Sequence, residues 1–136
     1  MSPMQTAQLT GADWAMLREQ VATIQAVVKK RYGSTFDQST EDLGPLQRLL
    51  DEGVYDDTHP EELRAMGAVF GNVIAKQLAF EWLLVDDEPS LKLKAANTLI
   101  VHPLKAIAER VRIAQRVDLT QMFNGIKADA KRTRIL

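Results

Sequence analysis

The chain has 136 residues, of which 46% are hydrophobic and 26% charged, a composition typical of one globular domain. The absence of cysteine excludes disulfides, thiolate metal sites and a cysteine nucleophile. No apolar stretch approaches the ~20 residues of a membrane-spanning helix, and Met1 to Thr10 lack the features of a secretory signal. We therefore expect a cytoplasmic single domain over residues 1–136, with a flexible N-terminus at 1–9 and a frayed basic tail at 131–136.

The net charge of −1 hides a strong asymmetry along the chain. Between Asp37 and Glu62 there are nine acids and one base, Arg48, whereas from Lys92 to Leu136 there are ten bases and three acids. Folding could bring the two segments together so that they neutralise one another. Alternatively, the acidic segment could remain a charged face that selects a partner of opposite sign.

Three helices are predicted in the first part of the chain, and the first and third of them are long. One spans about Gly11 to Tyr32, with Thr10 as its cap, Asp13 as the capping-box acid and Gly33 at its end. A short helix is expected after Gly44-Pro45, closed by Gly53. A third begins at the Thr58-His59-Pro60-Glu61 start signal and runs to about Ala79.

Gly67, Gly71 and Ala75 recur every four residues on one stripe of that third helix. An interior glycine costs ~1 kcal/mol relative to alanine, so this spacing predicts the close approach of another backbone, with ligand contact as the alternative.

The segment from Ala79 to His102 predicts a three-stranded antiparallel meander. A hairpin turning at Glu88-Pro89 would pair Leu84 with Leu93, and a second turn at Ala96-Asn97 would set Leu93 against Ile100. Further helices are expected after His102-Pro103 and from Asp118 or Thr120 onward. The fold class is therefore α+β, with about five helices packed on a three-stranded antiparallel β-meander.

Several blocks within this region resemble a known bacterial family. They are Leu63 to Gly71, Glu81-Trp82-Leu83-Leu84-Val85-Asp86-Asp87-Glu88, and Val101-His102-Pro103-Leu104, with Arg110 and Val117 beyond. The family is catalogued as domain of unknown function 3806, and the resemblance covers about residues 60–126. It implies a small α+β bacterial domain and carries no activity, cofactor or catalytic residue.

The acids at the end of the first predicted strand are the main candidates for chemistry. Asp86, Asp87 and Glu88 could gather a cation, but consecutive strand residues point to opposite faces, and calcium-loop spacing is absent. His102 would lie near Asp86 and could act with it as a base and its orienter. No motif supplies a nucleophile, so we expect no metal, cofactor or catalytic group.

Nucleic-acid binding is disfavoured, because the sequence pI of about 6.1 is low and aromatic residues are not interleaved with the basic ones. We favour a non-enzymatic module that binds another protein through Asp51, Glu52, Asp56 and Asp57. A bacterial immunity or antitoxin-type protein, with a toxin as partner, is one form of such a module. The alternative is a small hydrolase or ligand-binding domain centred on Glu81, Asp86, Asp87, Glu88 and His102. The sequence indicates no oligomeric state.

Overall fold

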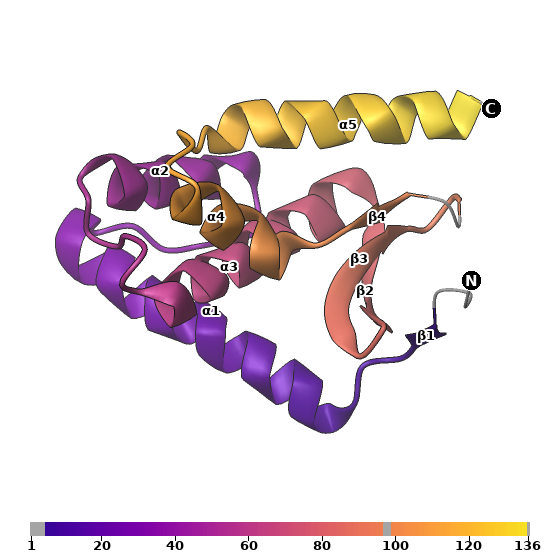
Figure 1. Ribbon diagram of the computed structural model, residues 1–136, viewed down its shortest axis with the longest axis horizontal. Coiled ribbons are helices and arrows are strands. Elements are labelled where there is room, and N and C mark those ends of the chain that lie inside the picture. Colours follow the sequence, from indigo (N-terminus) through magenta and orange to yellow (C-terminus); the bar gives the residue numbers. More distant parts are fainter. Residues whose placement is uncertain (1–4, 97–98, 136) are drawn as a thin grey trace.

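The computed structural model describes residues 5–96 and 99–135 as an α+β fold with five α-helices and one antiparallel sheet (Figure 1). The sheet has four strands in the order β1-β2-β3-β4, so the predicted meander gains a fourth, N-terminal strand. In chain order the elements are β1 (Thr6–Ala7), α1 (Gly11–Tyr32), a 3-10 turn (Thr40–Asp42), α2 (Leu43–Asp51), α3 (Pro60–Leu78), β2 (Phe80–Val85), β3 (Glu88–Leu93), β4 (Ile100–Val101), α4 (Pro103–Arg112) and α5 (Leu119–Ile135).

Helix α1 has the predicted limits and the predicted caps. The Asp13 backbone N–H donates to the Thr10 hydroxyl oxygen at 3.1 Å, and the Thr10 backbone N–H donates to the Asp13 carboxylate at 2.8 Å. Gly33 ends the helix with a φ of 69°. The helix buries one stripe that includes Leu17. Trp14 lies three residues before Leu17, a spacing that would place it on the same stripe, but it is 41% exposed.

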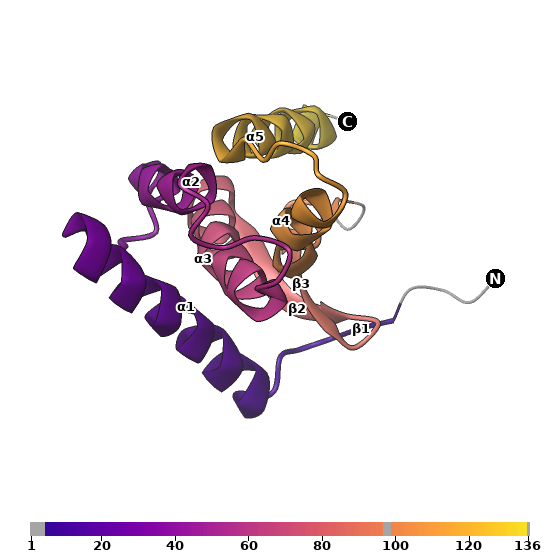
Figure 2. The same ribbon diagram turned by 60° about the vertical axis from the view of Figure 1, so that its left-hand side comes forward.

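Helix α3 is the central element of the fold, with α1 on one side and α4 on the other (Figure 2). Pro60 occupies its first turn as predicted, but Thr58 does not cap it. The Thr58 N–H and hydroxyl instead donate to the Asp56 carboxylate, at 2.9 and 2.6 Å, so the N-cap position falls to His59. At the other end Ala79 adopts a φ of 58°, which closes the helix and turns the chain directly into β2.

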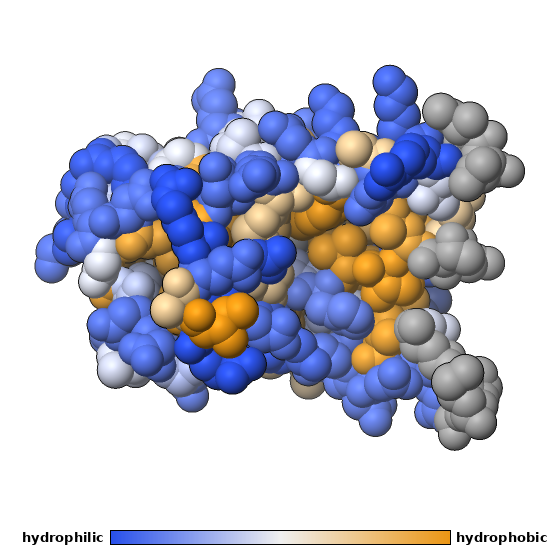
Figure 3. All heavy atoms as spheres, turned by 45° about the horizontal axis from the view of Figure 1, so that its top comes forward, coloured by the Kyte–Doolittle hydropathy of each residue, from blue (hydrophilic) through white to orange (hydrophobic). Residues whose placement is uncertain are grey.

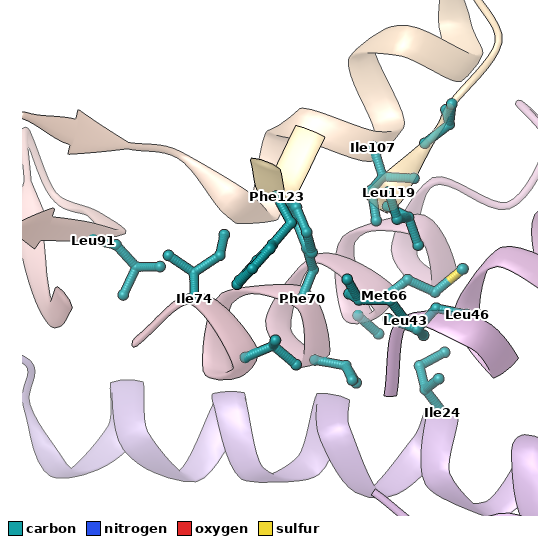
Figure 4. Close-up of a cluster of buried hydrophobic side chains, with 14 of the residues drawn as sticks. Ile24, Leu43, Leu46, Met66, Phe70, Ile74, Leu91, Ile107, Leu119 and Phe123 are labelled. Carbon is teal, nitrogen blue, oxygen red and sulfur yellow. The ribbon is translucent and has the colours of Figure 1, made fainter. Parts of the chain in front are cut away.

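The hydrophobic core surrounds α3 and draws side chains from every helix and from the sheet (Figure 4). Met66 and Phe70 of α3 are fully buried, as are Ile24 of α1 and Ile107 of α4. Close packing of such apolar side chains is the main stabilising contribution to a domain of this size.

The two glycines of α3 serve close packing, as predicted. A Cβ atom on Gly67 would lie 2.3 Å from the carbonyl oxygen of Pro103, at the start of α4. A Cβ atom on Gly71 would lie 2.5 Å from the Trp82 ring, whose Nε1–H donates to the Asn72 side chain at 3.0 Å. Both contacts are far shorter than a real Cβ tolerates, so α4 and the sheet approach α3 over bare backbone.

The β2–β3 hairpin turns two residues earlier than predicted. Leu84 pairs with Pro89 rather than with Leu93, and Phe80 is the partner of Leu93. The turn residues are Asp86 and Asp87, with φ values of 49° and 67°. This is the left-handed pair that a two-residue hairpin turn requires, and aspartate accepts it more readily than most residues.

The β3–β4 register differs from the prediction by one residue. Leu91 pairs with Val101 and Lys92 with Ile100, so Val101 rather than Ile100 shares a face with Leu91. Asn97, the second residue of the other predicted turn, lies outside the described residues.

The last two helices are close to the prediction, with two differences. Ala114, which continues the three- and four-residue spacing of Leu104, Ile107 and Val111 and would on that pattern face inward, lies beyond α4 and is exposed, with a φ of 58°. Helix α5 continues through Ile135, where the sequence predicts a frayed tail, and the Arg134 guanidinium donates to the carbonyl oxygen of Leu78 at 2.7 Å. No helix of the described residues combines the length and apolar character needed to cross a membrane.

Candidate functional site

The predicted acidic surface lies at the end of α2 and in the connection from α2 to α3, and its four acids differ in how they are engaged. Glu52 is the most fully paired. It accepts hydrogen bonds from the Tyr32 hydroxyl at 2.9 Å and the Arg48 Nε at 3.1 Å, and its carboxylate lies 3.8 Å from Arg31. The Tyr32 hydrogen bond, followed by the hydrogen bond and charge of Arg48 and the charge of Arg31, holds the pKa of Glu52 below its usual value. Glu52 is therefore a neutralised member of the acidic segment.

Asp56 organises the loop that precedes α3. Its carboxylate accepts from Thr58 and lies 3.1 Å from the Nδ1 of His59, and these contacts, with Thr58 first, lower the pKa of Asp56. The His59 ring packs edge-on against Tyr55, with ring centroids 5.6 Å apart. Burial raises the pKa of the Tyr55 phenol, and the charge of Glu62 adds to that effect.

Asp51 and Asp57 engage fewer partners. Asp51 accepts one hydrogen bond, at 3.0 Å, from the Gln47 side chain, and it remains exposed. Asp57 is also exposed, and no hydrogen bond or ion pair involves its carboxylate within the described part of the chain. These two are the members of the acidic segment most available to a partner.

The connection from α4 to α5 faces this acidic surface. The Gln47 side chain of α2 fixes it, donating to the Val117 carbonyl oxygen at 2.9 Å and accepting from the Leu119 backbone N–H at 2.9 Å. Val117 is buried, whereas Ile113 is 59% exposed. Ile113 is therefore an exposed apolar side chain on a connection that hydrogen bonds hold in place.

Two hollows separate the acidic surface from the α4–α5 connection. The larger is about 370 Å³ and has a largely apolar floor with Asp51, Asp56 and Arg116 at its rim. The smaller is about 150 Å³ and lies between Asp57 and Arg112. Ile113 lines neither hollow, although its chain neighbours Arg112 and Ala114 line one each. The larger hollow is lined by Leu50, Asp51, Gly53, Tyr55, Asp56, Val111, Ala114, Gln115, Arg116 and Val117.

The opposite charges approach each other here without forming ion pairs. Within residues 5–96 and 99–135, the ion pairs of the acidic segment join Glu52 to Arg31 and Arg48, and Asp56 to His59. Arg116 pairs with Asp118 in its own connection, at 3.7 Å. The acidic segment is thus partly neutralised by α1 and α2, and its carboxylates approach the basic α4–α5 region across the two hollows without pairing.

The fold does not bring the residues of the alternative site at the β2–β3 hairpin together into one cluster. Asp86 anchors β1, because its Oδ1 accepts from the Gln5 N–H at 3.0 Å and its own N–H donates to the Gln5 carbonyl at 2.8 Å. Asp87 is exposed in the turn. Glu88 forms an ion pair with Arg64 of α3 at 2.6 Å. Among the described residues, no group of three or more histidine, aspartate or glutamate side chains could hold a metal ion.

His102 has a partner that the sequence does not indicate. Its Nδ1 lies 2.9 Å from the Ser90 hydroxyl, which also donates to the Glu88 carbonyl at 3.1 Å. Ser90 is 0% exposed, so its hydroxyl is closed to a substrate, and the pair bonds β3 to the start of α4. Glu81 is paired with Lys92 at 3.6 Å on the same face.

The sequence predictions omit three residues of these surfaces. Gln47 and Ser90 are unremarkable in sequence, and only the fold brings Gln47 within reach of residues 117 and 119. Ile113 lies off the apolar stripe of Leu104, Ile107 and Val111, so helical periodicity could have marked it as an apolar residue that faces outward.

The fold and these surfaces define a small α+β domain without a gathered catalytic group in its described part. The chain belongs to the family described as Domain of unknown function (DUF3806), which matches residues 42–123. The match begins within the 3-10 turn and ends in α5, so β1 and α1 lie outside it.

A crystal structure of a protein from Bacteroides thetaiotaomicron has a similar fold. Its TM-score is 0.80 at 18% sequence identity, over 91% of this chain and 47% of that one. This chain therefore spans about half the length of that neighbour. No curated protein matches the sequence.

Proposed function

We propose that this domain is a non-enzymatic module that binds another protein through the surface between the α2–α3 and α4–α5 connections. The observation that carries the proposal is the exposure of Ile113, 59%, on a connection that Gln47 fixes. Other residues of the same connection, from Ala114 to Val117, line an apolar-floored hollow. An apolar anchor surrounded by polar groups is the common pattern of a protein-binding surface.

The partner's chemistry follows from the acids that remain available. Asp51 and Asp57 border the two hollows and are not neutralised by the basic helix opposite. A partner that brings basic side chains to these carboxylates would gain complementary charge there, while Ile113 enters an apolar depression on its surface. An immunity-type protein that covers the basic site of a toxin would fit this description. The alternative at Glu81, Asp86, Asp87, Glu88 and His102 is less favoured, because all of these side chains except Asp87 already engage separate structural partners.

The test is capture from a native extract, followed by reconstitution with the identified partner in purified form. The double charge reversal Asp51→Lys/Asp57→Lys should slow association, and the difference from wild type should shrink as salt screens the charges. Ile113→Ser should instead raise the dissociation rate, since an apolar anchor acts after encounter.

The matched control is Glu19→Lys/Glu41→Lys, which changes net charge equally at exposed positions away from both hollows. Glu52 is left intact, because its reversal would break contacts with Tyr32 and Arg48. If the double reversal and the control alter association alike, or if Ile113→Ser has no effect on an otherwise stable complex, this surface is not the binding site.

A further inference from the structure

Gly125, in the middle of α5, lacks the packing reason that explains the glycines of α3. A Cβ atom at Gly67 or Gly71 would strike a neighbouring element, whereas nothing lies within 4 Å of the position that a Cβ on Gly125 would take. An interior glycine costs a helix about 1 kcal/mol relative to alanine. At Gly125 no packing contact offsets this cost, and the bare helix backbone borders open space.

The open space is part of a groove between α5 and the elements beneath it. The groove measures about 550 Å³, within the range of small-molecule sites. Val101, Met122 and Ile126, all half-buried, supply its apolar surface, and the fully buried Phe70 lies at its base. Figure 3, which views the molecule from the side of α5, shows hydrophobic side chains gathered in a patch over the sheet end of this face.

The charged groups of the groove are unevenly distributed along it. Arg110 and Arg116 lie where α4 ends, whereas Asp129 lies 11 residues beyond Asp118 along the chain, or roughly 16 Å at the rise of an α-helix. Asp118 is paired with Arg116, and Asp129 with Arg132. The end near α4 is therefore the more positive one.

Arg110 is the cation of this end that no acid neutralises. One nitrogen of its guanidinium donates to the carbonyl oxygen of Ala106, at 3.1 Å, and within the described chain no carboxylate forms an ion pair with it. The Gln115 N–H donates to the Arg110 carbonyl oxygen at 2.8 Å, which brings the Gln115 and Arg116 side chains to the same end. A carboxylate could accept from the remaining guanidinium nitrogens in the paired geometry that arginine favours.

We propose that this groove binds an amphipathic organic anion, a medium-chain carboxylate, with its head group at Arg110 and its hydrocarbon chain along Val101, Met122 and Ile126. Gly125 provides the width for the chain to lie against α5. The groove shares Gln115 and Arg116 with the larger hollow, so its head-group end adjoins the protein-binding surface proposed above.

The proposal predicts how affinity depends on the ligand. Each additional buried methylene should strengthen binding about fourfold, the factor that corresponds to ~0.8 kcal/mol of transfer free energy. Decanoate should bind more tightly than octanoate and hexanoate, and acetate should not bind measurably. Decanol, which has the chain without the charge, should bind at least tenfold more weakly than decanoate, because it forgoes the charge-assisted hydrogen bonds.

The experiment is calorimetric titration of the whole chain with these five compounds, combined with NMR of the Val101, Met122 and Ile126 methyl groups. Arg110→Gln should weaken decanoate at least tenfold and leave decanol unchanged. Gly125→Leu should block the groove while helix propensity favours the variant over glycine. The matched control, Gly44→Leu, also places leucine at a helix glycine with open space, in α2, and should bind as wild type does.

Four results would each overturn the proposal. Equal affinity for decanol and decanoate would refute recognition of the anion. Unchanged decanoate binding in Gly125→Leu would place any binding elsewhere. Chemical-shift changes on adding decanoate that leave the three methyl groups unaffected would do the same. No binding of decanoate up to its solubility limit would refute the site itself. If either variant fails to fold, the chain-length series and the NMR map on the wild-type protein decide the question alone.

Discussion

Replacing Gly67 and Gly125 each by alanine should change stability in opposite directions, although the same methyl group enters an α-helix at both positions. Alanine regains about 1 kcal/mol of helix propensity in either helix. At Gly125 nothing lies within 4 Å of the new Cβ, so this gain should appear almost undiminished.

At Gly67 the new Cβ meets the Pro103 carbonyl oxygen at 2.3 Å and the Leu104 Cα at 2.9 Å. Both are backbone atoms at the start of α4, so no side-chain rotation relieves the contact and the whole of α4 must move away from α3. Overpacking of this kind costs about 1–3 kcal/mol and occasionally more, and a backbone contact this short belongs at the upper end. After the propensity gain, Gly67→Ala should lose about 2 kcal/mol, which places it about 3 kcal/mol below Gly125→Ala.

Urea unfolding followed by circular dichroism measures both variants against wild type, with unchanged slopes as the check for two-state behaviour. In a chain of this length, a loss of 2 kcal/mol corresponds to a fall of very roughly 5–10 °C in Tm. If Gly67→Ala proves as stable as wild type, or if Gly125→Ala is the less stable of the two, the packing assigned to these glycines is wrong.

Three further outcomes follow from side chains described above. Gln47→Ala should cost about 1–3 kcal/mol, since the Val117 carbonyl and the Leu119 N–H both lose a partner, and hydrogen exchange should accelerate at the Leu119 amide; an unchanged exchange rate would contradict the role of Gln47. Tyr32→Phe should raise the pKa of Glu52, because the hydroxyl stabilises the carboxylate, and a carboxyl-carbon NMR titration reports this directly. With that pKa lowered in the native state, the stability that Glu52 contributes is present above pH 4.5 and is lost as the pH falls below it. Asp42, in the 3-10 turn, is 3% exposed and accepts hydrogen bonds from the Asp37 and Gln38 backbone N–H groups. Its pH dependence has the opposite sign: burial raises its pKa above 3.8, so wild-type stability measured against Asp42→Asn should fall as the pH rises through the interval just above 3.8, and a rise there would refute the assignment.

The parts of the fold that the sequence predicts are those whose signals are local. The capping box at Thr10 and Asp13, the terminating Gly33 and the proline at the start of α3 act within one or two helical turns, and the structure has them where the sequence places them. Gly67 and Gly71 indicate close approach because the cost of an interior glycine can be judged without knowing its neighbour.

The errors arise where the deciding contact is remote or where two local signals compete. Proline at position 89 suggested the turn, but left-handed conformations at Asp86 and Asp87 set the hairpin two residues earlier. Strand β1 contains two residues and no pattern of its own, and its hydrogen bonds run to residues more than 75 positions away. For the candidate surfaces, the sequence predicts the acids but not Gln47, Ile113 or Gly125, whose significance depends on what stands opposite them.

The attachment of β1 has a consequence for the order in which the structure forms and opens. Helix α3 and strands β2 and β3 are consecutive in the chain, so their mutual contacts close only short loops. The Gln5–Asp86 hydrogen bonds, by contrast, span 81 residues and add only a two-residue strand pair. So small a strand pair adds little stabilisation of its own, so the N-terminal strand should be the last part of the sheet to form and the first to detach. Its detachment would leave the outer edge of β2 without a strand while the helical core stays intact.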